Sequence, residues 1–158
     1  MKKIAKFEKV SLAEYQKSSA VDTYGDIILP RRATSGSAGY DFFAPEEFTL
    51  APAQTVKIPT GVRVKIDEGW VLKIYPRSSL GFKYRLSLDN TVGIIDSDYY
   101  YSDNEGHIFV RLTNCSLDKT LTVKSGEGFC QGIFTEYFIT YDDEVSEVRN
   151  GGFGSTTK

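Results

Sequence analysis

Apolar and polar residues alternate through the middle of the chain with the period of two that is typical of half-buried β-strands. Across 58–75 the alternation runs on both sides of a Glu68-Gly69 turn, which predicts a β-hairpin. Similar short strands are predicted at 107–112, 121–123 and 129–138, each bounded by clusters of Gly, Asn, Asp or Ser. Many short strands at close spacing predict an all-β domain, either a barrel or a sandwich.

Two segments are predicted to be helical, and both are short. Ser11 followed three residues later by Glu14 has the form of a capping box, which predicts a helix over 11–20. After Pro76, either Ser78 or Ser79 is placed to cap a second short helix. The predicted fold is therefore all-β with one or two short helices.

Length and composition predict one domain over 1–158 rather than two. The chain has 158 residues, of which 41% are hydrophobic, and this is enough for one ordinary core. Residues 149–158 are mostly glycine and polar residues, which predicts a flexible C-terminal arm.

Charge and hydropathy limit the partners. A formal net charge of −2 gives no broad positive field, which argues against a nucleic-acid ligand. No apolar run reaches the length of a signal peptide or a membrane span, so we expect a cytoplasmic protein with no membrane partner.

Cys115 and Cys130 lack a CxxC spacing and are expected to be two buried thiols. His107 is the only histidine and is expected at the surface without a role.

A first candidate for binding chemistry lies at 75–81. A proline ends the predicted strand, and Arg77, Ser78 and Ser79 precede the predicted helix. Free N–H groups at a helix start attract phosphate, and an arginine and hydroxyls beside them add charge-assisted hydrogen bonds. Taken alone, a capped helix with a surface arginine explains the segment equally well.

A second candidate lies at 90–99, where an apolar, hairpin-like stretch is followed directly by acids. The backbone of a strand edge alternates N–H and C=O groups and could read the acceptor, donor and acceptor groups of uracil. Asp96 suits a base that deprotonates water, and Asp98 has the composition of a turn former. Residue type alone does not choose between the two acids.

Three further segments combine glycine with polar residues. They are 35–42, which contains Asp41; 125–131, which leads into a strand; and the arm, in which Phe153 stands among glycines. Such an arm could close over a ligand and stack on a base, and the plain alternative is a disordered tail.

Taken in order, these five segments resemble the five motifs of the trimeric all-β dUTPase family. The matching runs are 38–42, 76–81, 93–99 and 152–156, and Gln131 marks the fourth motif. Four well-formed motifs in the correct order make the match specific. The resemblance implies a distorted, jelly-roll-like β-barrel that assembles into a homotrimer with active sites shared between subunits.

The resemblance also implies an activity, the hydrolysis of dUTP to dUMP and pyrophosphate by a dUTP diphosphatase, which keeps uracil out of DNA and supplies dUMP for dTMP synthesis. Asp96 would activate the water that attacks the α-phosphorus, while Asp98 would be mainly structural. The backbone from Asn90 through Ile95, with Gly93, would read uracil, and Tyr99 would pack on the deoxyribose. The other residues implied to bind substrate are Arg77, Ser78, Ser79, Gln131, Arg149, Phe153, Gly154, Ser155 and Thr156.

The implied cofactor is Mg²⁺, held by phosphate oxygens and water rather than by direct protein ligands. Asp41 would orient the site through a water on the metal. In the arm, Phe153 would stack over uracil while Arg149, with the hydroxyls of Ser155 and Thr156, would lie near the γ-phosphate. In-line phosphoryl transfer needs charge neutralisation and alignment, which this arrangement supplies.

The chain departs from the family pattern in two places. The third motif usually continues with an Arg-Gly pair, whereas residues 100–106 form a longer polar excursion that is expected to be an enlarged surface loop. Gly128 stands where the fourth motif normally carries an arginine. The excursion and the N-terminal helix resemble family members from Gram-positive bacteria and their prophages.

Two other hypotheses stay open at this point. A dCTP deaminase shares the fold and parts of the second and third motifs, and the intact arm and the 95–99 run favour the dUTPase over it. Outside enzymes, the chain could be a partner of a repressor protein, as some phage-borne relatives are. This role is compatible with catalysis, because Asp96, Tyr99 and Phe153 are all in place.

Overall fold

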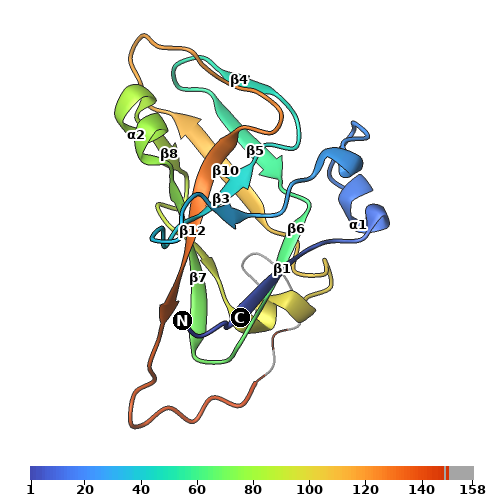
Figure 1. Ribbon diagram of the computed structural model, residues 1–158, viewed down its shortest axis with the longest axis vertical. Helices are drawn as coiled ribbons and strands as arrows, with labels where there is room; N and C mark the ends of the chain where they lie inside the picture. Colours follow the sequence, from blue (N-terminus) through green and yellow to red (C-terminus); the bar gives the residue numbers. More distant parts are fainter. Residues whose placement is uncertain (148, 150–158) are drawn as a thin grey trace.

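The computed structural model describes residues 1–147 and 149. Its largest sheet has five antiparallel strands in the order β2 (Arg31–Arg32), β3 (Tyr40–Phe43), β12 (Gly128–Glu136), β7 (Trp70–Pro76) and β9 (Gly93–Ile95). β12 pairs with β3 on one edge and with β7 on the other (Figure 1). This sheet holds most of the residues that the sequence singles out for chemistry.

Smaller antiparallel sheets complete the fold. β10 (Phe109–Asn114) lies between β5 (Thr55–Pro59) and β8 (Leu86–Leu88). β1 (Ala5–Lys9) pairs with β6 (Val62–Ile66), and β11 (Leu121–Val123) pairs with β4 (Phe48–Leu50). Buried side chains from all four sheets form one core, which includes Phe42, Leu72, Leu112 and Phe129. The prediction of an all-β fold with short helices is confirmed.

The predicted hairpin at 58–75 is wrong in its pairing, although both strands and their turn exist. Gly69 has a positive φ of 84°, and the Trp70 N–H donates to the Asp67 carbonyl, so the chain does turn there. Among the described strands, however, β6 pairs with β1, while β7 lies between β12 and β9. The alternation predicts strands, but the partner of β6 is β1, which comes from a distant part of the chain.

The two predicted helices exist and are short. α1 (Leu12–Gln16) begins at the Ser11 cap, whose side chain accepts a hydrogen bond from the Glu14 N–H at 3.1 Å. The helix ends at Gln16, so the predicted extension to residue 20 is wrong. α2 (Ser78–Tyr84) begins as predicted, but Arg77 is its N-cap, and in the described part of the chain no side chain caps it, so the predicted serine cap is wrong.

Two 3₁₀ helices add to these elements. η1 (Tyr24–Asp26) follows α1, and η2 (Ser97–Tyr101) follows β9 directly. Within residues 1–147 and 149, no helix has the length and apolar character needed to cross a membrane.

His107 is completely buried, so its predicted surface position is wrong. Its ring packs against Tyr15 and Phe109, with ring centroids 6.2 and 4.3 Å away, and its Nε2 accepts from the Gly61 N–H at 2.9 Å. The tight turn at Gly106, with φ of 72°, directs the strand that follows into the core. Burial lowers the pKa of His107 to about 4.

The two cysteines differ in burial. Cys130 is buried within β12, as predicted, and burial raises the pKa of its thiol. Cys115 is exposed, so its predicted burial is wrong. It follows Asn114, whose side chain is buried at the end of β10, and the period of two therefore turns Cys115 outward.

The burial of His107 predicts a pH dependence of stability. The folded pKa of about 4 lies below the ordinary value of 6.5, so the unfolded chain binds a proton between these values that the folded chain does not. The free energy of unfolding keeps its full value above about pH 6.5 and falls by on the order of 3 kcal/mol as the pH drops towards 4. Urea unfolding at fixed protein concentration across this range measures the slope, which His107→Gln should flatten. An unchanged slope in the variant would contradict this assignment.

Candidate active site

A cavity of about 410 Å³ lies between the edges of two sheets. β8 is an edge strand of the three-stranded sheet and β9 is an edge strand of the five-stranded sheet. Backbone groups on such edges have no ladder partner on the open side and are available to a ligand. The residues lining the cavity are Lys57, Ile74, Leu88, Asp89, Asn90, Gly93, Ile94, Ile95, Phe109, Val110 and Arg111.

The turn between β8 and β9 shapes this cavity. The Thr91 N–H donates to the Leu88 carbonyl at 3.0 Å, and Thr91 itself has a φ of 67°. A Cβ atom on Gly93 would lie 3.1 Å from the Ile74 Cβ, so glycine permits the close approach of β9 to β7. The predicted uracil-reading residues Asn90, Gly93 and Ile95 therefore line one cavity, as the sequence led us to expect.

The two acids of the third motif follow the cavity directly. Asp96 comes after the last residue of β9 and is the N-cap of η2, and Asp98 lies in the first turn of η2. Both side chains are half-exposed. Tyr99, in the same turn, is buried, and burial raises the pKa of its hydroxyl.

Arg149 contacts both acids. Its Nη2 donates to Asp96 Oδ2 at 2.6 Å, and its Nε donates to Asp98 Oδ1 at 3.0 Å. Its guanidinium carbon lies 6.0 Å from the centre of the Tyr99 ring. One guanidinium thus shares the negative charge of two carboxylates, and the first residue of the predicted arm lies in the candidate site of its own chain.

A second polar cluster gathers at the other end of the large sheet. Asp41 on β3 lies opposite Gln131 on β12, and Arg77 follows the end of β7. Arg77 Nε lies 3.3 Å from Asp41 Oδ1, and Arg77 Nη1 donates to the Gly128 carbonyl at 3.1 Å. Gln131 Nε2 donates to the Pro76 carbonyl at 3.2 Å. The first, second and fourth motifs therefore meet in one place.

The departure at Gly128 has a steric reason. A Cβ atom there would lie 2.7 Å from Arg77 Nη1 and 3.2 Å from its guanidinium carbon. The absence of a side chain lets the Arg77 guanidinium lie against the backbone of β12. An arginine at this position would compete with Arg77 for the same space.

The two groups of residues are far apart within one chain. Ile95, next to Asp96, lies opposite Leu72 on β7, and Arg77 is five residues further along the same strand direction. At about 3.3 Å per residue, Arg77 lies about 16 Å along the chain from Leu72. Fixed backbone pairing maintains this offset, and within the described residues Arg77 pairs with Asp41 whereas Asp96 pairs with Arg149.

The sequence motifs account for only part of the cavity lining. Lys57, Asp89, Phe109 and Arg111 also line it, and Arg111 Nε lies 2.7 Å from Asp89 Oδ2. Lys57 and Arg111 come from different strands and are cross-strand neighbours. Only the pairing of β5 with β10 reveals this, because neither residue belongs to a motif.

Ser78 and Ser79 are exposed at the start of α2, beside Arg77. Phe153, Gly154, Ser155 and Thr156 lie outside the described residues. Among the described residues, no three His, Cys, Asp or Glu side chains gather in a way that could hold a metal ion.

The fold is thus all-β, with a cavity at strand edges, acids that directly follow it in the chain, and a separate Arg-Asp-Gln cluster. The dUTPase family model matches residues 25–157. The chain is 44% identical to the deoxyuridine 5'-triphosphate nucleotidohydrolase of Lactococcus lactis subsp. lactis over 133 residues. This alignment covers 82% of this chain and 88% of the relative. Identity to the enzyme of the same name from Photorhabdus laumondii is 42%, over 80% of this chain and 84% of the relative. The chain belongs to the dUTPase family.

Solved structures agree with this assignment. The dUTPase from Streptococcus mutans superimposes with a TM-score of 0.67 at 36% identity, covering 85% of this chain and 97% of that one. The dUTPase from phage phi11 of S. aureus superimposes with a TM-score of 0.68 at 20% identity, covering 92% of this chain and 97% of that one, and this shows a shared fold. The resemblance to the family, with a Gram-positive relative among the structures, is confirmed.

Proposed function

We propose that the protein hydrolyses dUTP to dUMP and pyrophosphate, with Asp96 as the base, in a site completed by another copy of the chain. One observation carries the proposal: Asp96 directly follows Ile95, which lines the cavity at the β8 and β9 edges, whereas Arg77 lies about 16 Å along the chain from Leu72, the partner of Ile95. The comparisons add that relatives named for this reaction match most of the chain.

The cavity supports recognition of uracil by backbone groups. Along the edge of β9 and the turn before it, N–H and C=O groups alternate, which suits the O4, N3–H and O2 edge of the base. Gly93 is packed closely on Ile74, so the wall of the cavity has little freedom to retreat from a thymine methyl group. Tyr99, which is buried in the turn that follows Asp96, would form the wall against the deoxyribose.

Asp96 is placed to deprotonate a water for in-line attack on the α-phosphorus. It is half-exposed, so a water can reach its carboxylate, but Arg149 occupies one of its oxygens. Triphosphate offers the Arg149 guanidinium more negative charge than Asp96 does, and binding would draw it towards the γ-phosphate. Substrate would in this way release the base that acts on it.

The phosphates would lie against the second cluster. Arg77, the hydroxyls of Ser78 and Ser79, and Gln131 would bind their oxygens, and Asp41 holds the Arg77 guanidinium in place. When bound, Mg²⁺ would neutralise charge on the triphosphate and would take most of its ligands from phosphate oxygens and water. Asp41 fits a contact through water, since the ion pair with Arg77 uses Oδ1.

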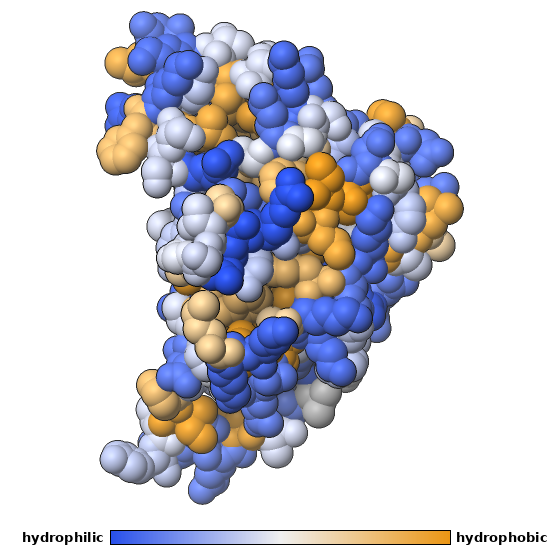
Figure 2. All heavy atoms as spheres, in the orientation of Figure 1, coloured by the Kyte–Doolittle hydropathy of each residue, from blue (hydrophilic) through white to orange (hydrophobic). Residues whose placement is uncertain are grey.

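Two surface features support assembly from several copies. Residues 137–147 run away from the sheet at the lower end of the molecule, where Figure 2 shows apolar side chains at the surface. Within the described residues, β1 pairs only with β6 and leaves its other edge open, which suits the addition of a strand from another copy. The exposed apolar residues within 137–147 are Tyr137, Phe138, Ile139, Tyr141 and Val145. The homotrimer of the family is consistent with these features.

The proposed activity is tested by measuring pyrophosphate release from dUTP, dCTP, dTTP and UTP in the presence of Mg²⁺. We expect release from dUTP with strong preference over the others. Ammonia release from dCTP would instead identify a deaminase, and silence on every nucleotide would favour a binding protein. Repressor binding and a cytoplasmic location stay predictions.

Asp96→Asn should retain the affinity for dUTP and lose turnover by roughly 10²–10⁴-fold, because the substitution removes the base with little change in shape. Asp98→Asn is the matched control, since Asp98 also binds Arg149 but would be mainly structural. Steady-state kinetics and calorimetric binding of dUTP measure the two effects. Equal losses of turnover in both variants would contradict the assignment of Asp96 as the base.

Gly128→Ala should weaken substrate binding, because the added Cβ would displace the Arg77 guanidinium from Asp41. We expect KM for dUTP to rise about tenfold with the melting temperature nearly unchanged, a loss typical of one charge-assisted hydrogen bond. Gly25→Ala serves as the control, since a Cβ there meets no atom within 4 Å. The same KM in both variants would remove Arg77 from the phosphate site.

A further inference from the structure

The hydroxyl of Tyr99 is held by two hydrogen bonds on the side away from solvent. It accepts from Asn104 Nδ2 at 2.9 Å and donates to the His107 carbonyl at 2.7 Å. Tyr99 is only 6% exposed. Because the tip of the ring is fixed, the position of its face is fixed as well.

Asn104 is itself held by the turn that follows it. Its Oδ1 accepts from the Gly106 N–H at 3.1 Å, and its carbonyl accepts from the His107 N–H at 3.0 Å. A Cβ atom on Gly106 would lie 2.7 Å from the Tyr100 Cα, so the turn packs directly on the backbone of η2. The enlarged loop expected from the sequence is therefore folded back against the site.

The excursion is also tied to the N-terminal helix. Glu105 accepts hydrogen bonds from the Ser11 N–H at 2.7 Å and the Ser11 hydroxyl at 2.6 Å, and these bonds lower the pKa of its carboxyl. Tyr100 adds a second connection, because its hydroxyl donates to Glu8 on β1 and its ring lies 3.9 Å from the Arg63 guanidinium. These contacts tie the loop to β1 and to the start of α1, in a conformation in which Asn104 meets Tyr99.

We propose that Asn104 is a positioning residue for sugar discrimination, which holds the Tyr99 ring where a 2'-hydroxyl would collide with it. The inference rests on the proposed function, because it assigns the sugar-facing wall of the same site. Without the Asn104 amide donor, the Tyr99 hydroxyl keeps its hydrogen bond to the His107 carbonyl, and the ring can move back from the sugar. A deoxyribose loses little from this movement, whereas a ribose gains room.

The test is the ratio of kcat/KM for dUTP to kcat/KM for UTP. Asn104→Ser is the informative variant, because a serine hydroxyl can accept from the N–H two residues on and keep the turn, but is too short to reach Tyr99. We expect the ratio to fall about threefold to tenfold, the size of one neutral hydrogen bond, mainly through faster turnover of UTP. Asn104→Ala should give the same fall.

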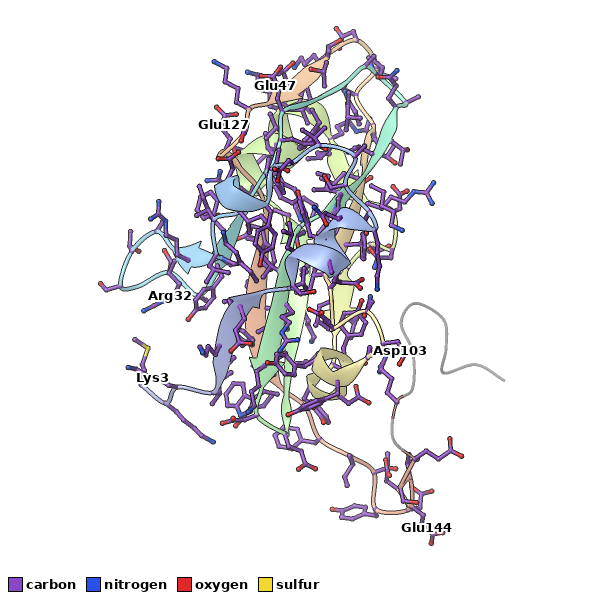
Figure 3. The ribbon with its side chains drawn as sticks, turned by 90° about the vertical axis from the view of Figure 1, so that its right-hand side faces the viewer. Lys3, Arg32, Glu47, Asp103, Glu127 and Glu144 are labelled. Atoms are coloured by element: carbon purple, nitrogen blue, oxygen red, sulfur yellow. The ribbon has the colours of Figure 1, made fainter. Side chains whose placement is uncertain are left out.

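Two controls separate positioning from general damage to the fold. Asp103→Ser makes a similar substitution at the exposed neighbour, which Figure 3 labels at the outside of the loop, and should leave the ratio unchanged. In a Tyr99→Phe background, which lacks the hydroxyl, Asn104→Ser should have almost no further effect on the ratio.

The outcomes are distinguishable. If the wild-type protein does not hydrolyse dUTP, the proposed function fails and this inference fails with it. If the wild type discriminates between dUTP and UTP but Asn104→Ser lowers both rates equally, or acts undiminished in the Tyr99→Phe background, only the role of Asn104 is overturned. Should Asn104→Ser not fold, a fall of the ratio in Tyr99→Phe alone supports the anchored hydroxyl, and an unchanged ratio there contradicts it.

Discussion

The pairing of β7 with a different strand on each edge is the constraint on which the rest of the structure depends. On one edge Leu72 lies opposite Ile95, which places the cavity and Asp96 beside the start of β7. On the other edge Pro76 lies opposite Cys130, which places Gln131 and Arg77 at its end. Backbone ladders hold both registers, so side-chain movement cannot close the gap of about 16 Å. Under the proposed function, a site that uses both ends would combine copies of the chain.

In each half of the proposed site, an arginine is already paired with carboxylates before substrate arrives. Arg77 pairs with Asp41 in one half, and Arg149 pairs with Asp96 and Asp98 in the other. Such pairing orients the carboxylates, while leaving the arginines able to transfer to phosphate, which guanidinium binds strongly and often through two hydrogen bonds. The excursion holds Tyr99 through Asn104, so the geometry of each half exists within one copy of the chain.

The sequence predicted those parts of the fold that depend on neighbours along the chain. Alternation identified β6, β7 and β11, the Ser11 cap identified the start of α1, and the ordered motifs identified Asn90, Gly93 and Ile95 as one wall. The sequence did not predict the features that depend on contacts between distant segments. The partner of β6, the burial of His107 behind Gly61, and the presence of Lys57 and Arg111 in the cavity all depend on pairing between strands that no local pattern encodes.

Mixing two inactive variants tests the division of the site most directly. Asp96→Asn lacks the base and Arg77→Ala lacks the phosphate contact, and the two are refolded together from denaturant in equal amounts and assayed for dUTP hydrolysis. If Asp96 and Arg77 of one site come from different copies of a trimer, random assembly restores about a quarter of the wild-type activity, because one site in each mixed trimer has both residues. If both residues act within one copy, the mixture stays as inactive as its components.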